Sequence, residues 1–331
     1  MSYATEKKKV ERKIKRLKRI LWAVVLSFVL MLVILSAFYP AATWKYHFRL
    51  PEFDMRGEGE LRIHYVDVGQ GDATLIELPD NKIMLIDGGT DEEGSKLALL
   101  RYITALKIKS IDYLLVTHAD GDHCGGLKTL VEYIDVKRAF LPVCDLTANQ
   151  KYADFYAALM KRQCPWEYST KGVDLSVSGD YGYTLQFLYP YSLSAEEQTT
   201  DDNLFSAVVW LDYKGVSALF TGDAPKRVEE RLVQDDKLHL LADAVSLSST
   251  EILKVSHHGS GDATSEEFVE YLNVEHAMIS CGKDNAYGHP ASTVCENLAA
   301  VGAEIHRSDV HGSVIATIAI DGTYAVERLG K

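Results

Sequence analysis

The sequence predicts a layered α/β domain with mixed β-sheets, tethered to a membrane by one N-terminal helix. Three observations support this prediction. Apolar runs typical of strands alternate with helical patterns from residue 61 onward, an uncharged stretch of twenty residues precedes them, and potential metal ligands follow several of the runs. With 47% hydrophobic and 25% charged residues, the 331-residue chain has a globular composition.

The N-terminus carries an excess of positive charge. Residues 1–19 contain nine Lys/Arg and two acidic residues, a net charge of +7, so residues 20–331 carry a net charge of −19 out of the overall −12. Residues 20–39 contain no charge and end at Pro40. As a helix they would span roughly 30 Å, the hydrocarbon core of a bilayer. Because positive residues stay on the cytoplasmic side, we expect a cytoplasmic 1–19, a single transmembrane helix at 20–39 in the cell membrane, and an extracytoplasmic remainder.

The anchor is expected to be retained. The apolar run is longer than the core of a usual signal peptide, and Phe38 to Ala42 form a poor cleavage site, although cleavage stays an alternative. Residues 40–60 are expected to form a linker, and residues 61–331 one large domain. The five cysteines are expected to be small buried thiols, with a Cys144–Cys164 disulfide as the alternative.

The strand and helix patterns follow one another along the domain. Apolar runs rich in β-branched and aromatic residues predict strands at 61–68, 74–78, 83–86, 113–117, 185–189, 206–213, 216–221, 252–255, 277–280 and 314–320. Helical periodicity predicts helices at 95–106, 126–134, 152–162, 226–233, 265–272 and 292–301. Residues 190–203 and 235–250 are expected to be surface loops.

The strongest chemical signal is the segment from Thr117 to Gly126. It follows a predicted strand, opens a predicted helix, and places four metal-capable side chains within six residues: His118, Asp120, Asp122 and His123. The loop beyond a strand's carboxyl end is where open α/β sheets place their ligands. Helix capping would explain one Asp but not two Asp and two His. The segment therefore predicts a metal site.

Two further strands lead to potential ligands. The run at 216–221 ends in Gly222-Asp223, and the run at 252–255 is followed by His257-His258-Gly259. Alone, an Asp after a strand is usually a turn former. Their shared position after a strand favours a common site.

Together these motifs resemble the metallo-β-lactamase superfamily and, within it, the hydrolase domain of ComEC-like DNA-uptake proteins and its stand-alone relatives. The resemblance runs in order over roughly residues 61–320 and leaves out residues 1–60 and the channel segment. The matching segments are Asp67-Val68-Gly69-Gln70-Gly71-Asp72-Ala73, Leu85-Ile86-Asp87-Gly88-Gly89, His118 to His123, Asn203 with Ser206, Thr221-Gly222-Asp223, Val255-Ser256-His257-His258-Gly259-Ser260 and Tyr287-Gly288-His289-Pro290.

The resemblance implies an αββα sandwich of two mixed sheets with helices outside and a metal cleft along one edge. By position, Asp122 and His123 bind one metal ion and His118 binds the other. Asp223 bridges the two ions.

The resemblance also implies a supporting residue and a further ligand. One residue of the pair His257 and His258 completes the site, and we favour His258 because it immediately precedes the small Gly259. Asp87 matches the buried acidic residue that braces the ligand loop.

Two departures from the superfamily pattern bear on the metal. Asp120 occupies the position of the second histidine, a change that the ComEC-like branch shares, and residues 201–206 lack the histidine that many members supply in mid-chain. One metal site is therefore poorer in imidazole and richer in oxygen. Oxygen ligands favour harder ions, so we expect one or two divalent ions, with manganese or magnesium competing with zinc.

Further candidates lie in the motifs outside the ligand loop. Lys283 and His289 could stabilise a phosphoryl transition state or assist the leaving group, and with Asp122 they are the expected catalytic residues. Four others are expected to support the cleft or contact substrate: Asp72, Asn203, Ser206 and Tyr287. Gln70 could touch the ligand loop or close a hairpin. The remaining histidines are expected to be structural or surface residues: His47, His64, His239, His276, His306 and His311.

The expected function is phosphodiester hydrolysis at the outer face of the membrane by a metal-bound hydroxide. The resemblance suggests DNA as substrate and a link to DNA uptake during competence. The net charge of −19 after residue 19 argues for caution, because general DNA affinity comes largely from basic surfaces. Two alternatives stay open: a surface esterase acting on phosphocholine or teichoic-acid phosphodiesters, and a membrane-displayed binding domain without turnover. Besides the membrane and the substrate, DNA or a cell-wall polymer, no protein partner is identifiable.

Overall fold

In the computed structural model, the described residues are 3–38, 45–48, 50–146, 149–191 and 201–330. They divide into two compact units, Met1–Arg49 and Leu50–Lys331. The first unit contains the long helix α1, Tyr3–Phe38. Its part Glu6–Ile34 includes an 18-residue window that is long and apolar enough to cross a membrane. The helix also includes most of the basic segment, because Lys, Arg and Glu are good helix formers. Pro40, predicted to end the apolar run, lies outside the described residues.

The second unit is built on two large sheets. The first has eight strands in the order β16-β15-β1-β2-β3-β5-β7-β8. Antiparallel pairs join β16 through β3, and parallel pairs join β3, β5, β7 and β8. The bounds are β1 Leu61–Tyr65, β2 Thr74–Glu77, β3 Ile83–Ile86, β5 Tyr113–Leu115, β7 Ala139–Leu141, β8 Trp166–Tyr168, β15 Val314–Ile318 and β16 Tyr324–Arg328.

The second sheet has six strands in the order β14-β13-β12-β11-β10-β9. Its four strands from β11 to β14 run parallel. The bounds are β9 Thr184–Tyr189, β10 Val208–Tyr213, β11 Val216–Phe220, β12 Ile252–Lys254, β13 His276–Ile279 and β14 Glu304–Arg307. A separate short pair consists of β4 Ser110–Ile111 and β6 Asp135–Val136.

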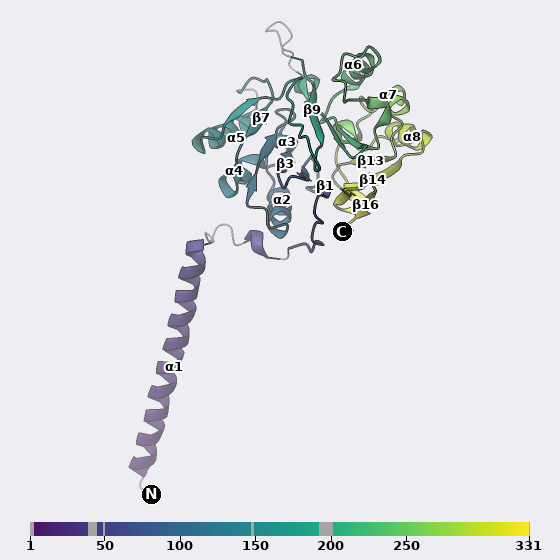
Figure 1. The fold of residues 1–331 in the computed structure, drawn as a ribbon. Helices are drawn as coiled ribbons and strands as arrows, with labels where there is room; N and C mark the ends of the chain where they lie inside the picture. Colours follow the sequence, from purple (N-terminus) through teal and green to yellow (C-terminus); the bar gives the residue numbers. More distant parts are fainter. Residues whose placement is uncertain (1–2, 39–44, 49, 147–148, 192–200, 331) are drawn as a thin grey trace. The chain divides into compact units, whose positions relative to one another are not determined.

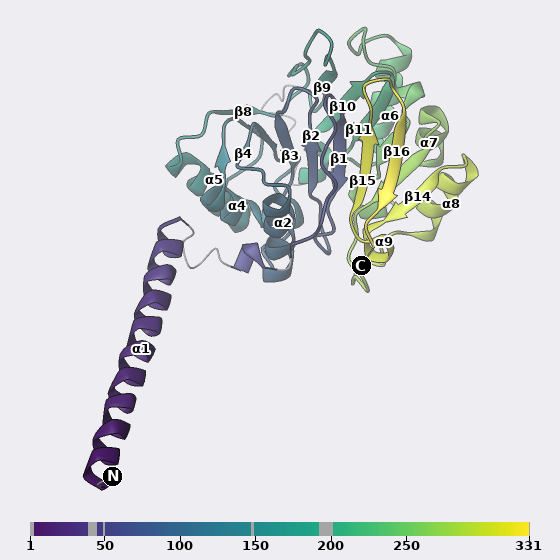
Figure 2. The same ribbon diagram turned by 60° about the horizontal axis from the view of Figure 1, so that its bottom comes forward.

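Helices cover the outer faces of both sheets (Figures 1 and 2). On the side of β3 and β7 lie α2 Glu93–Ala105, α4 Leu127–Tyr133 and α5 Gln150–Lys161, and on the other side lie α6 Lys226–Lys237, α7 Glu266–Leu272 and α8 Ser292–Ala300. One apolar core, which includes Ile63, Phe187 and Phe220, fills the space between the sheets. A second core packs Trp210 and Leu253 against the helices α6 to α8. The predicted αββα sandwich is confirmed.

The sheet topology brings several strand ends to one edge of the domain. In the first sheet β3 and β5 are parallel, and in the second β11, β12 and β13 are parallel. Their carboxyl ends lead into short segments named α3 Gly121–Cys124 and η4 Ser256–Gly259, and into the loop after β11. Loops that follow parallel strands meet at the same edge, so the segments with the predicted ligands lie together.

Two predictions about the elements were wrong in detail. Residues 235–237 belong to α6 and not to a surface loop, because Val228, Leu232 and Asp235 lie on its buried face. Asp235 is buried and pairs with Lys171 at 3.4 Å and with Arg231 at 3.0 Å. These ion pairs explain how an acidic residue can belong to the buried face of the helix. Besides the two-residue strands β4 and β6, four strands of the large sheets were not predicted: β7, β8, β14 and β16. The first two have only three residues, and the last two are half-exposed and lack an apolar run.

Residues 50–60, before β1, belong to the second unit and pack on its other parts. The guanidinium of Arg56 donates to the carbonyl of Leu78 at 2.7 Å, and Phe53 packs edge-on against Tyr102 with ring centroids 4.7 Å apart. All five cysteines lie in the described part of the chain and are free thiols. Cys124, Cys164 and Cys281 are buried, whereas Cys144 and Cys295 are only partly buried.

Candidate metal centre

The ligand loop after β5 is held by close backbone contacts. The amide of Asp72 donates to the carbonyl of Asp122 at 3.1 Å, and the amide of Gly88 donates to the carbonyl of His123 at 2.8 Å. At Gly126 an added Cβ would lie 2.2 Å from the carbonyl oxygen of Gly88. Only glycine fits there, since any side chain would separate the two loops. The loop geometry therefore depends on three segments that are distant in sequence.

Asp87 sets the orientation of two histidines. One of its oxygens accepts the Nδ1 hydrogen of His123 at 2.8 Å and the hydroxyl hydrogen of Thr117 at 2.7 Å. Because that hydroxyl donates to Asp87, it accepts from Nδ1 of His118 at 3.0 Å. These partners place a hydrogen on Nδ1 of both imidazoles and leave their Nε2 atoms facing inward.

His258 adopts the same arrangement from the other sheet. Its Nδ1 donates to the carbonyl of Ser280 at 2.9 Å, so its Nε2 also points inward. The backbones of His257 and His258 have φ of +50° and +54°, in the left-handed region that non-glycine residues rarely adopt. This turn buries His258 and leaves His257 partly exposed at the rim. The geometry favours His258 as the inner member of the pair.

The inward-facing atoms converge on one point. Nε2 of His258 lies 3.3 Å from Nε2 of His123, 3.3 Å from Oδ2 of Asp122 and 3.5 Å from Oδ2 of Asp223. Nε2 of His123 lies 3.2 Å from Oδ1 of Asp223. Ser206 braces the loop of Asp223, because its hydroxyl accepts the Asp223 amide at 3.1 Å. Separations of 3.2–3.5 Å are those of atoms that share one cation at about 2.0–2.2 Å.

Several buried atoms in this cluster lack hydrogen-bond partners among the described residues: Nε2 of His118, Oδ1 of Asp223 and Oδ1 of Asp72. The Asp223 oxygen lies 3.2 Å from Nε2 of His123. An unsatisfied buried polar atom costs about 1–3 kcal/mol. Several such atoms facing one centre are the arrangement that a metal ion satisfies. The buried Asp/His cluster is therefore able to bind metal ions.

The charges of the cluster also favour a bound cation. Burial alone would lower the pKa of His123, but the carboxylates of Asp223 and Asp87 raise it well above its usual value. Burial would raise the pKa of Asp223, yet His123 and His258 hold it well below its usual range. Burial, and then His123, lower the pKa of His118 to about 3, so His118 is neutral at pH 7. The carboxylates thus require positive charge between them, and His118 offers a lone pair.

A second group of atoms lies beside the first at wider spacing. Nε2 of His118 is 3.7 Å from Oδ2 of Asp120 and 3.8 Å from Oδ2 of Asp223. Nε2 of His257 is 3.7 Å from the same Asp223 oxygen, while its Nδ1 contacts Asp262 at 3.1 Å. Asp223 therefore lies between the two groups, where a bridging ligand would be. The wider group has fewer close ligands, as the predicted loss of a histidine implies.

Residues 66–161 match the family model described as the metallo-beta-lactamase superfamily. The domain has the metallo-β-lactamase fold. Curated relatives match a longer stretch. The chain is 29% identical over 275 residues to ComE operon protein 3 of Bacillus subtilis, covering 78% of this chain and 33% of the relative. It is 28% identical to competence protein ComA of Neisseria gonorrhoeae, covering 78% and 32%. These matches confirm the predicted resemblance.

The chain spans about a third of the length of these relatives. Among solved structures, the metallo-β-lactamase fold protein YhfI from Bacillus subtilis matches with a TM-score of 0.48 and 10% identity, over 81% of this chain and 100% of that chain.

Three predicted residues, His289, Tyr287 and Lys283, lie in the loop after β13, called the rim loop. The ring of His289 stacks on that of His258 with centroids 6.3 Å apart, and Tyr287 stacks on His289 at 5.6 Å. Burial, and then His258, lower the pKa of His289, so its imidazole is neutral at pH 7. Lys283 is exposed in the same loop.

Two other predicted residues contact neighbouring loops. Gln70 accepts the amide of Gly282 at 3.0 Å, which links the turn after β1 to the rim loop and not to the ligand loop. The side-chain oxygen of Asn203 is buried without a hydrogen-bond partner among the described residues.

The sequence analysis missed Lys254. It ends β12, is 3% exposed, and pairs with Oδ2 of Asp72 at 2.6 Å. Its ammonium also donates to the carbonyl of Val255 at 2.9 Å. The other oxygen of Asp72 lies 3.7 Å from Nδ1 of His258. Lys254 therefore holds Asp72 beneath the cluster. A lysine inside an otherwise apolar strand was the signal that could have identified it.

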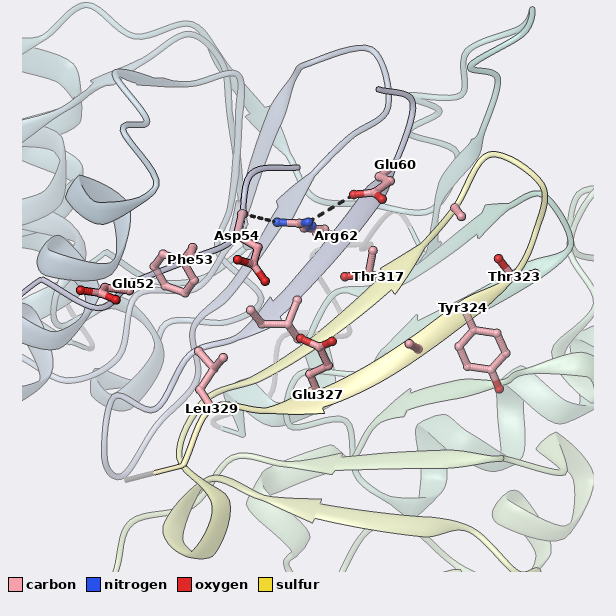
Figure 3. A pocket seen from close by; sticks show the side chains of 13 residues that line it. Glu52, Phe53, Asp54, Glu60, Arg62, Thr317, Thr323, Tyr324, Glu327 and Leu329 are labelled. Atoms are coloured by element: carbon pink, nitrogen blue, oxygen red, sulfur yellow. Dashed lines mark hydrogen bonds and ion pairs between the residues drawn. The ribbon is translucent and has the colours of Figure 1, made fainter. Parts of the chain in front are cut away.

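A pocket of about 550 Å³ lies elsewhere, on the outer face of β1, β15 and β16 (Figure 3). Its charged lining consists of Glu52, Asp54, Glu60, Glu327 and Arg62. The guanidinium of Arg62 bonds to the carbonyl of Asp54 at 2.9 Å and to Glu60 at 3.2 Å. The pocket shares no residue with the Asp/His cluster.

Proposed function

We propose that residues 61–331 form a metal-dependent hydrolase of phosphodiesters. The observation that carries the proposal is the convergence of two imidazole nitrogens and two carboxylates, from His123, His258, Asp122 and Asp223, on one point. The unpartnered Nε2 of His118 lies beside this point. The carboxylates, together with Asp120 beside them, make the site rich in oxygen. Such a site suits manganese or magnesium as well as zinc.

Each residue has a defined part in the proposed site. A bound divalent ion would supply Lewis-acid polarisation of a phosphoryl oxygen and lower the pKa of water. Asp87 keeps His118 and His123 in the tautomers that present Nε2. In this proposal neutral His289 takes up or delivers a proton, and the Lys283 ammonium binds a non-bridging oxygen.

The domain arrangement is part of the proposal. The basic residues 1–19 would stay in the cytoplasm, residues 20–39 would cross the membrane, and residues 40–60 would connect them to an extracytoplasmic domain. Since residues 50–60 pack on the second unit, we place the structural start of the domain at Leu50. The positive charge of residues 1–19 supports this orientation.

Nucleic acid is the substrate that we favour. Relatives named for competence and, in Haemophilus influenzae, a relative named recombination protein 2 that is 28% identical over 256 residues support DNA. The net charge of −19 after residue 19 favours the second candidate, a phosphodiester of choline or of teichoic acid. Salt-dependent binding of single-stranded DNA would favour the nuclease, and choline release from cell walls would favour the esterase.

The test uses the full chain purified in detergent and supplied with manganese. We expect release of nucleotides from single-stranded DNA. The double variant Asp122→Ala, His123→Ala should lose about a thousandfold in rate, because several kcal/mol of metal-dependent stabilisation disappear. The matched control His276→Ala, His306→Ala removes two histidines outside the cluster and should keep the wild-type rate.

Two outcomes would contradict the proposal. Equal rates in the two double variants would reject the site. A chain that retains almost no metal, and whose melting temperature does not respond to manganese or zinc, would instead support a binding domain without turnover.

A further inference from the structure

An exposed aromatic ring stands at the end of a column of rings that leads to the metal centre. His258 is buried in the cluster, His289 stacks on it with an interplanar angle of 23°, and Tyr287 stacks on His289 at 25°. Tyr287 is 70% exposed. The column therefore presents an aromatic face to solvent two ring steps from the cluster.

The loop that carries Tyr287 is held firmly. The amide nitrogen of the Asn285 side chain donates to the carbonyls of Gly282 and His289 at 2.9 and 2.7 Å. Its oxygen accepts the backbone amides of Tyr287 and His289 at 3.2 and 3.0 Å. One side chain thus fixes both ends of the turn. The position of the ring is set before any ligand arrives.

The rim loop is also joined to the metal-site loops on both sides. Gln70 bonds to Gly282 as described, and the amide of Ala291 donates to the carbonyl of Gly259 at 2.8 Å. A ring that is mostly exposed contributes little burial to folding, so a rigid support for it is explained by recognition and not by stability.

We propose that the outer face of Tyr287 stacks a nucleobase of a single-stranded nucleic acid whose phosphate lies at the Asp/His cluster. This inference rests on the proposed function and names its substrate. In a duplex the bases are already stacked on both faces, so an open ring selects unpaired bases. Stacking requires no basic surface, which reconciles nucleic-acid binding with the negative charge of the domain. Lys283 supplies a local positive charge in the same loop.

The geometry favours a nucleobase over a quaternary ammonium group. A choline headgroup is usually bound in a cage of several aromatic faces. Here the rings form a single stack, in which the neighbour of Tyr287 is His289. A flat partner extends this column, whereas a spherical cation contacts only one face of it.

The experiment compares two substrates on the full chain with manganese. One is a short single-stranded oligothymidylate, and the other is the same oligomer with abasic residues. We expect the wild type to have a KM about tenfold lower for the oligothymidylate, because one stacked base contributes about that factor. In Tyr287→Ala the two KM values should converge, while Tyr287→Phe should keep the difference. Tyr168→Ala, which removes another exposed tyrosine from β8, is the matched control.

A binding measurement separates this inference from the proposed function. Fluorescence anisotropy of the labelled oligomers on metal-free protein should show the same tenfold preference in Kd and the same loss in Tyr287→Ala. If neither oligomer is cleaved, the proposed hydrolysis fails and the Kd values alone decide the inference. Equal KM and Kd for both oligomers in the wild type would overturn the nucleobase site. So would inhibition by phosphocholine that Tyr287→Ala abolishes.

Discussion

Two clusters of histidine and acidic residues lie at opposite ends of the parallel strands of the second sheet. One contains Asp72, His123, Asp223 and His258 beyond the carboxyl ends of β11 and β12, and the other contains His276, Glu304 and His306 on β13 and β14. In each, the potential ligand atoms lie within 4.8 Å of one another. By residue type and distance alone, both are candidate metal sites.

The hydrogen bonds distinguish them. In the first cluster every Nδ1 hydrogen goes outward, to Asp87 or Ser280, and the inward-facing Nε2 atoms of His123 and His258 lie 3.3 Å apart. Burial alone would lower the pKa of both imidazoles, but the carboxylate of Asp223 raises it. The facing nitrogens therefore need positive charge between them, which protons or a metal ion can supply.

In the second cluster the lone pairs already have donors. The Nε hydrogen of Arg328 is donated to Nδ1 of His306 at 3.1 Å, and its Nη2 donates to Glu304 at 2.7 Å. Nδ1 of His306 is thus an acceptor, so its Nε2 carries the hydrogen that is donated to Nδ1 of His276 at 3.1 Å. A metal ion on His306 would have to displace Arg328. The comparison shows that the direction of the donors, and not proximity, identifies a metal centre.

The largest expected effect is on the amount of metal that the protein binds when the histidines of one cluster or the other are removed. We expect His123→Ala, His258→Ala in the full chain to lose the bound metal, because the variant removes both nitrogens from the convergent point. The variant His276→Ala, His306→Ala should keep it. Metal analysis after dialysis against manganese measures the content directly. With manganese at about 100 times its Kd, the second variant should also gain about 2.7 kcal/mol in unfolding free energy, as the wild type does. Equal loss of metal in the two variants would show that the direction of the hydrogen-bond donors does not decide which cluster binds metal.

The same contrast explains what the sequence could predict. The ligand loop was predictable because His118, Asp120, Asp122 and His123 lie within six residues after an apolar strand. Asp223 and His258 were predictable because each follows a strand, and parallel strand ends share an edge. Whether these residues act as ligands stays a prediction, but the structure brings their side chains together.

The part of the site that was not predicted depends on tertiary contacts that a sequence does not show. Lys254 looks like one charge in a strand, and its pairing with Asp72 appears only when β12 is placed beside the turn after β1. The second cluster joins His276, His306 and Arg328 from three strands, and two of these strands lack an apolar run. Half-exposed edge strands of this kind are stabilised by their neighbours rather than by their own pattern.

A smaller effect is expected when Asp87, which accepts a hydrogen from His123 of the first cluster, is replaced. In Asp87→Asn the new amide group presents a donor where the Nδ1 hydrogen of His123 needs an acceptor. The imidazole should then change tautomer and lose its inward lone pair. We expect about 10- to 100-fold weaker manganese binding, measured by titration calorimetry, with the fold intact by circular dichroism. Asp321→Asn, in an exposed turn, is the control. Unchanged affinity in Asp87→Asn would mean that Asp87 does not set the tautomer.

The smallest expected effect concerns the second cluster and its response to pH. Burial lowers the pKa of His306 to about 4, and the charge of Arg328 adds to this, with Glu304 opposing and His276 and His311 assisting. Since the unfolded chain has a His pKa near 6.5, it binds more protons than the folded chain between these values, and stability falls as pH decreases from about 6.5 to about 4. Solvent near the cluster reduces the effect to about 1–2 kcal/mol. His306→Asn keeps an acceptor for Arg328 but does not titrate. Chemical denaturation of metal-free protein at pH 7.5 and pH 5 should show a smaller loss in this variant than in the wild type. An equal loss in both would place the acid sensitivity elsewhere and leave His306 without a part in it.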